Sequence, residues 1–124
     1  MAEDLWPDNI AESNLVTPVS ILKEQAALLG DKTKQLVVAV VDTDTSGDNF
    51  FHRFYIVAPT LNYRYDLFYV EHGIAFYPLM LKWQGEPLPR KLSDEAGFKA
   101  FLKQVLSSQH TMNVVHSILA QVRS

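Results

Sequence analysis

The sequence predicts one α+β domain in which helices pack on an antiparallel sheet. Apolar residues recur with helical spacing over residues 18–30, and again from residue 93 to the end of the chain. Between them, residues 35–83 are rich in β-branched and aromatic side chains with a period of two. The connections between these strand-like runs are short, which favours a meander of antiparallel strands. We therefore expect an N-terminal helix, a four-stranded antiparallel meander, and two C-terminal helices packed on the sheet.

The chain of 124 residues divides into a short arm and a body. Residues 1–16 are acidic, contain no lysine or arginine, and are interrupted by Pro7 and two asparagines. We expect residues 1–16 to form a flexible acidic arm and residues 17–124 to form the single α+β domain. The apolar side chains of the arm could dock on the body or on a partner, and they are Leu5, Trp6, Ile10 and Leu15.

The first helix is expected to begin at Thr17, whose hydroxyl suits the N-cap position, with Pro18 as the first helical residue. Gly30 is expected to end this helix, because glycine readily adopts the conformation that closes a helix. The apolar residues between these two ends are spaced for one buried face, and they are Ile21, Leu22, Ala26, Leu28 and Leu29.

Four strands are expected, which cover residues 35–42, 50–58, 63–71 and 74–83. Both faces of the first strand are apolar, which predicts a central strand that is covered on both sides. Residues 43–49 predict a turn, and His72 with Gly73 predicts a tight two-residue hairpin turn. Pro78 cannot donate a backbone hydrogen bond, so it marks the fourth strand as an edge strand or as bulged.

The C-terminal part of the chain is expected to be helical after a loop over residues 84–92. Ser93 suits the N-cap of the next helix, and the phenylalanines and leucines that follow form an apolar stripe at helical spacing. A break over residues 107–110 separates this helix from the last one. One helix followed by a four-stranded meander is similar to the element order of cystatin-like folds, and fold alone carries no function.

Composition excludes several classes of function. The chain has no cysteine, which removes disulfides, thiolate nucleophiles, thiolate zinc sites and iron–sulfur clusters. A net charge of −3 is a poor balance for a protein that binds nucleic acid, so no nucleic-acid partner is expected. The longest apolar run covers only residues 36–41, far short of the roughly 20 residues that span a bilayer. No membrane partner and no secretory signal are therefore expected, and the predicted location is the cytoplasm.

One segment is similar to the beginning of a calcium-binding loop. Asp42, Asp44 and Ser46 match its first three ligand positions, and Gly47 matches its sharp turn. The twelfth position, which should hold a bidentate glutamate, holds Arg53 instead, and the flanking residues read as strands. Turn chemistry alone favours Asp, Ser and Gly here, so we interpret the segment as a hairpin turn and expect no metal site.

A second group of polar residues, His52, Asp66, Glu71 and His72, contains side chains that metal sites and acid–base pairs use. Their spacing matches no ligand pattern, so scattered surface positions are the favoured interpretation. The serines lie in no nucleophile elbow, and no glycine-rich phosphate loop is present. The sequence therefore predicts no catalytic residue and no cofactor.

Aromatic crowding is the best functional signal in the sequence. Ten of the twelve phenylalanines and tyrosines lie between residues 50 and 77. In a regular third strand Tyr63, Tyr65 and Tyr69 share one face, which suits a half-buried binding surface because each ring carries a polar tip. The predicted binding residues are these three tyrosines, with Arg64 and Trp83 nearby. Ordinary cross-strand packing of aromatic residues is the competing interpretation.

Two functions from different classes remain. The first is a protein-interaction module that uses the aromatic face of the sheet, with a second copy of itself or another protein as its partner. The alternative is a small enzyme or small-molecule binder with a pocket between the sheet and a helix. The absence of any catalytic spacing favours the interaction module, and the predicted assembly is a homodimer or a complex with another protein.

Overall fold

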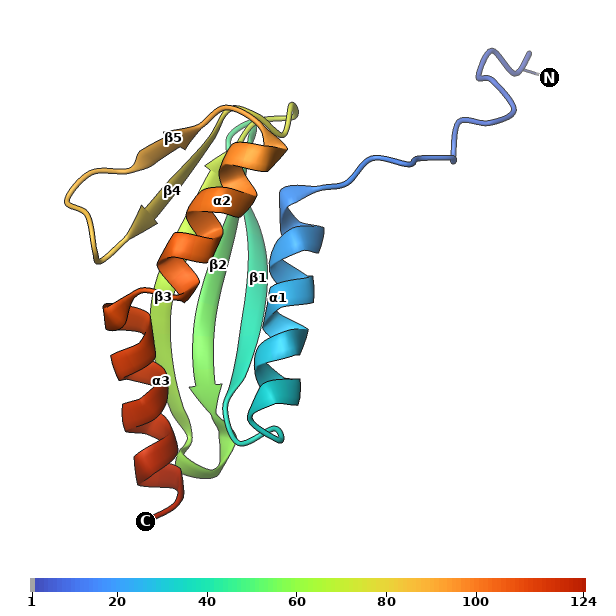
Figure 1. Cartoon of the computed structure of the whole chain (residues 1–124). Coiled ribbons are helices and arrows are strands. Elements are labelled where there is room, and N and C mark those ends of the chain that lie inside the picture. Colours follow the sequence, from blue (N-terminus) through green and yellow to red (C-terminus); the bar gives the residue numbers. More distant parts are fainter. Residues whose placement is uncertain (1) are drawn as a thin grey trace.

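A computed structural model describes residues 2–124 as three helices and a five-stranded antiparallel sheet, preceded by an extended arm (Figure 1). The strands follow one another across the sheet in chain order, from β1 to β5. The predicted α+β class is confirmed, whereas the sheet has five strands and not four. The elements are α1 (Pro18–Lys32), β1 (Val38–Ser46), β2 (Asn49–Ala58), β3 (Tyr63–His72), β4 (Leu79–Trp83), β5 (Arg90–Leu92), α2 (Glu95–Leu106) and α3 (Gln109–Val122).

Helix α1 begins as the sequence predicts and ends later. Thr17 caps it, because its Oγ1 accepts a hydrogen bond from the backbone N–H of Ser20 at 3.1 Å. The prediction that Gly30 ends the helix is wrong, since α1 continues to Lys32 and Thr33 is the C-cap. Gly30 lies instead beneath the side chain of Gln35, whose Oε1 would be 2.9 Å from a Cβ at this position. A Cβ at residue 30 would therefore require only the flexible Gln35 side chain to move, and Gly30 does not serve as a turn.

The first strand is an edge strand, so the prediction of a central strand is wrong. β1 pairs only with β2, and α1 packs against it on one face. On the other face Val38 and Val40 are only half-buried. Apolar residues on both faces therefore reflect one helix-covered face and one half-exposed face. The turn that follows comprises only Gly47, at a φ of 60°, and Asp48, because the strands extend over most of the predicted turn at 43–49.

The region around β4 also differs from the prediction. His72 belongs to β3, so His72 and Gly73 do not form a two-residue turn, and residues 73–78 connect β3 to β4. Pro78 directly precedes β4, where its missing N–H costs no ladder bond. β4 is not the edge, because β5 pairs with it in the segment predicted as a loop. β5 has only three residues, which follow two prolines and precede a helix cap. So short a segment shows no alternation of apolar and polar residues from which a strand could be predicted.

A bulge in β3 changes which side chains share a face. Phe54 pairs with Phe68, and the next residue of β2, Tyr55, pairs with Asp66, so Leu67 is the extra residue. Leu67 and Phe68 are consequently both buried, although they are neighbours in one strand.

All three helices lie on the same face of the sheet (Figure 1). The N-cap of α2 lies one residue after the predicted Ser93, because Asp94 accepts the hydrogen bond from the Gly97 N–H, at 2.7 Å. α3 is capped by Ser108. The core lies between the helices and the sheet and includes Leu22, Phe54, Ile56, Phe98, Leu102 and Ile118. The opposite face, which we call the open face, has no helix over it among the described residues.

Candidate functional site

The structure separates the five residues that the sequence grouped into one binding face. Tyr65 pairs with Ile56 on the helix-covered side, whereas Tyr69 pairs with Arg53 on the open face. The expectation that Tyr63, Tyr65 and Tyr69 share a face is wrong, because the bulge at Leu67 shifts the alternation between them. Arg64 also lies on the open face, where its guanidinium carbon is 3.6 Å from the centre of the Tyr55 ring. Trp83 lies on the helix-covered face, opposite Phe68.

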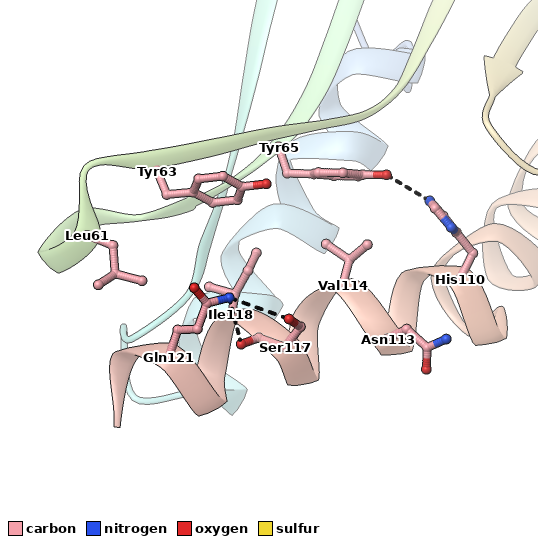
Figure 2. Close-up of a pocket in the computed structure, with 9 residues that line it drawn as sticks. All are labelled: Leu61, Tyr63, Tyr65, His110, Asn113, Val114, Ser117, Ile118 and Gln121. Atoms are coloured by element: carbon pink, nitrogen blue, oxygen red, sulfur yellow. Dashed lines mark hydrogen bonds between the residues drawn. The ribbon is translucent and has the colours of Figure 1, made fainter. Parts of the chain in front are cut away.

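Tyr63 and Tyr65 line a pocket of about 800 Å³ between β3 and α3 (Figure 2). Their rings form the wall on the β3 side, and residues from successive turns of α3 form the facing wall. Much of the lining is polar, with Asn113, Ser117 and Gln121 along α3. The Gln121 amide already donates to the Ser117 carbonyl, at 3.3 Å. We call this hollow the β3–α3 pocket.

One end of the β3–α3 pocket is closed by a small polar network. The Tyr65 hydroxyl lies 2.9 Å from Gln84 Oε1 and 3.0 Å from His110 Nε2. An amide oxygen can only accept, so the hydroxyl donates to Gln84 and accepts from the His110 Nε2–H. The Trp83 ring stands edge-on to His110. Burial, followed by the nearby Tyr63 hydroxyl, raises the pKa of Tyr65 above its ordinary value, so Tyr65 stays neutral.

The open face is aromatic, and its two arginines, Arg53 and Arg64, are already paired with carboxylates. Arg53 bonds to Asp44 at 3.0 Å and lies over the Phe51 ring, which stacks on Tyr69. Arg64 bonds to Asp66 at 2.9 Å. This is the pattern of a solvated face of an antiparallel sheet, which needs no partner.

A second hollow, of about 650 Å³, runs between α1 on one side and α2 with the start of α3 on the other. Its floor is formed by Phe54, Ile56 and Leu67 from the sheet. Residues at helical spacing on α1 line it, including Ile21, Leu28 and Leu29. α2 contributes Leu102 and Leu106. We call this hollow the interhelix groove, and its lining is mainly apolar.

The rim of the interhelix groove is positively charged. Lys99 and Lys103 line it from α2 and Lys32 from the last turn of α1, against the single carboxylate of Glu24. Lys99 pairs with Glu95 at 3.2 Å. Within residues 2–124 no ion pair engages Lys32 or Lys103. Leu28 is 45% exposed at this rim.

The structure brings together two histidines that the sequence suggested were scattered. The Nε2 atoms of His52 and His72 are 2.9 Å apart and both side chains are buried. His72 Nδ1 donates to the Gly73 carbonyl, at 2.7 Å, so its Nε2 accepts from the His52 Nε2–H. His52 Nδ1 then accepts from the Thr43 hydroxyl, at 2.9 Å. Burial, then His72 and Lys23, lowers the pKa of His52 to about 4.

None of the acidic residues that the sequence singled out is a hydrogen-bond partner of this histidine pair within residues 2–124. Asp66 bonds to Arg64, and Glu71 accepts from the Asn49 amide at 2.8 Å. Asp42 and Asp44 lie in β1 and not in a loop that could enclose an ion. Among the described residues no three histidines, aspartates or glutamates gather at metal-binding distance.

Comparison of the chain with protein-family models, with curated proteins and with solved structures finds no match. Within residues 2–124, no helix combines the length and the apolar character that crossing a membrane requires.

Sequence reasoning missed the groove and the role of His110. The signal for the groove was present, because Lys99, Leu102, Lys103 and Leu106 have the spacing of one helix face. Such a face reads as an ordinary amphipathic edge until the position of α1 is known. His110 carried no signal, since its partner Tyr65 is 45 residues away.

Proposed function

We propose that this chain is a protein-interaction module whose interhelix groove binds an apolar segment of a protein chain that carries acidic side chains. The observation behind this proposal is an apolar groove between helices whose rim carries lysines without ion-pair partners among the described residues. Grooves of this kind bind amphipathic segments through a few apolar anchors. The lysines would select acidic segments and speed their association.

Three surfaces compete for this role, and the groove is favoured for a physical reason. On the open face the arginines are paired with carboxylates of the same sheet. In the β3–α3 pocket, Tyr65 and Gln121 have hydrogen-bond partners in the chain. The groove, in contrast, presents a partly exposed Leu28 on α1 and, on α2, Lys103, which has no ion-pair partner among the described residues. A partner would gain most by covering this surface, because apolar burial drives association.

The proposal is of binding and not of catalysis. The titratable groups that line the groove are Glu24 and three lysines, and all of them are exposed at the rim. A catalytic acid or base works from a positioned site that is shielded from water, whereas these side chains are exposed to solvent.

Selection of random peptides displayed on phage against the full chain tests this proposal. We expect enriched peptides to combine large apolar residues with aspartate or glutamate, and to lose binding when Leu28→Glu places a carboxylate at the groove. Ile74→Glu is the matched control, because Ile74 is 85% exposed and does not line the groove. Peptides that bind the Leu28→Glu variant as well as the unchanged chain would contradict the proposal.

A second candidate, a small-molecule binder, is supported by the convergence of Tyr65 and His110 on the β3–α3 pocket. A ligand with hydroxyl groups and a flat ring would suit the tyrosine rings and the polar groups of α3. Titrating the isotope-labelled chain with a set of small aromatic polyols tests this candidate. Shifts confined to Tyr63, Tyr65 and His110 would favour it, whereas unchanged spectra would remove it.

A further inference from the structure

We infer that the segment which fills the interhelix groove is the N-terminal arm of a second copy of this chain, so that two chains exchange arms. This inference rests on the proposed function of the groove, and it names the partner. Its observations are the exposed apolar residues of the arm, the opposite charges of arm and groove, and the direction in which the arm leaves the body.

The arm holds an unusual share of the exposed apolar surface. Residues 2–16 contain no helix or strand, and every one of them is exposed. Five of the eleven large apolar side chains that are exposed in the described chain belong to this stretch. Leu5 is 82% exposed, Trp6 71% and Leu15 73%. Large apolar side chains gathered in this way mark a contact surface, and Trp is the residue most often found as an anchor at interfaces.

The charges of the arm and of the groove are complementary. Within residues 2–16 the ionisable side chains are all acidic, and they are Glu3, Asp4, Asp8 and Glu12. The groove rim holds three lysines against one glutamate. A negatively charged groove would repel such a segment, and an uncharged groove would not attract it. The match of charges therefore supports the arm as the occupant.

The direction of the arm favours a second molecule over the same one. Thr17 is extended, with φ −91° and ψ 153°, and the proline that follows disfavours the helical conformation at Thr17. The arm therefore leads away from the body at the start of α1, and Figure 1 shows no return towards the sheet. The eleven residue-to-residue steps from Trp6 to Thr17 can extend over at most about 36 Å, which is enough to reach a neighbouring molecule.

An exchange of arms gives a closed, symmetric dimer of ordinary size. Each chain contributes one arm and one groove, so the same two surfaces meet twice around a two-fold axis. Each chain would contribute up to 32 residues, the 15 of the arm and the 17 that line the groove, slightly more than the roughly 20–30 that each partner contributes to a standard interface.

Sedimentation velocity of the full chain over a range of concentrations tests the inference. We expect a dimer that dissociates on dilution, with a dissociation constant at least about tenfold larger for Trp6→Ser and for Leu28→Glu. Both residues are exposed in the single chain, so the variants should keep the circular dichroism of the unchanged protein. Ile74→Glu, which changes an exposed residue outside both surfaces, should dimerise normally.

Two results would overturn the inference. One is a monomer at every concentration, including the case in which Trp6 fluorescence shows that the arm docks on its own groove. The other is a dimer that neither variant weakens. A monomer whose groove binds displayed peptides would refute arm exchange and leave the proposed function intact. A monomer that binds no displayed peptide at the groove would refute both.

Discussion

The two hollows on the helix-covered side differ in whether the polar and charged groups of their walls have bonding partners within the chain. In the β3–α3 pocket the main polar groups bond to one another, as Tyr65 does with Gln84 and His110. In the interhelix groove the walls are apolar, and two of the rim lysines have no ion-pair partner among the described residues. The two hollows are of comparable size, about 800 and 650 Å³, so their volumes do not distinguish them. The groups of the walls that still lack a bonding partner are the better guide to function.

The largest expected loss of stability is at the floor of the interhelix groove, and it should exceed the loss at the wall of the β3–α3 pocket. Phe54 is 2% exposed and stacks on Phe68 at 4.8 Å, so Phe54→Ala should lower the free energy of unfolding by about 3–5 kcal/mol. Tyr63, which is 45% exposed, should cost less than about 1 kcal/mol when changed to alanine. Urea denaturation measures both. A loss below about 1 kcal/mol for Phe54→Ala would show that the floor is not part of the core.

The buried His52 should make the free energy of unfolding depend on pH below neutrality. The pKa of His52 is about 4 in the folded chain, against 6.5 when unfolded, so only the unfolded chain takes up a proton between these values. Stability should therefore be unaffected by this group above pH 6.5 and fall by about 3 kcal/mol as the pH drops to 4.

The pH dependence of the free energy of unfolding checks this expectation, with His52→Gln as the comparison. The variant should lose most of the slope between pH 6.5 and 4, whatever its stability at neutral pH. An unchanged slope would mean that the buried histidine pair is not the group that titrates.

The hydrogen-bond network of the β3–α3 pocket should have a smaller effect. Tyr65→Phe removes the hydroxyl that joins Gln84 and His110, and water can replace it because both partners are partly exposed. We expect a loss of about 1 kcal/mol in urea denaturation and no change in dimerisation. A weaker dimer would place this pocket, and not the groove, at the interface.

The smallest effect on stability is expected at the rim of the groove. Lys103→Glu should change the free energy of unfolding by less than about 0.5 kcal/mol, because the side chain is exposed. It should nevertheless weaken dimerisation and reduce its dependence on salt, since one attraction to the acidic arm is lost. Lys91→Glu on the open face is the control, and an equal effect there would show that only net charge matters.

Periodicity and helix caps predicted the fold class from the sequence, but they did not predict which strands lie at the edges of the sheet. Thr17 and Pro18 place the start of α1 correctly, because capping is a local interaction. The edge position of β1 was missed, since two apolar faces do not show that only one is covered. The short strand β5 was missed because three residues give no period.

The candidate site could be predicted only in part, because one residue changed its geometry. Tyr63 and Tyr65 line a pocket, but the bulge at Leu67 moves Tyr69 to the open face, and nothing in the alternation of apolar and polar residues shows an inserted position. The buried pair of His52 and His72 depends on strand register and on the length of β3. The groove depends on where α1 lies, which is a long-range property.

The most direct test uses the fact that the chain contains no cysteine. A nitroxide attached to an Asn9→Cys variant in unlabelled protein, mixed with ¹⁵N-labelled protein, broadens only the amide signals that the arm of the other molecule approaches. The account predicts the strongest broadening at Leu28 and Lys103, which line the interhelix groove, and weaker broadening at Tyr63 and Gln121, which line the β3–α3 pocket. Stronger broadening at the pocket than at the groove, or no broadening at all, would contradict it.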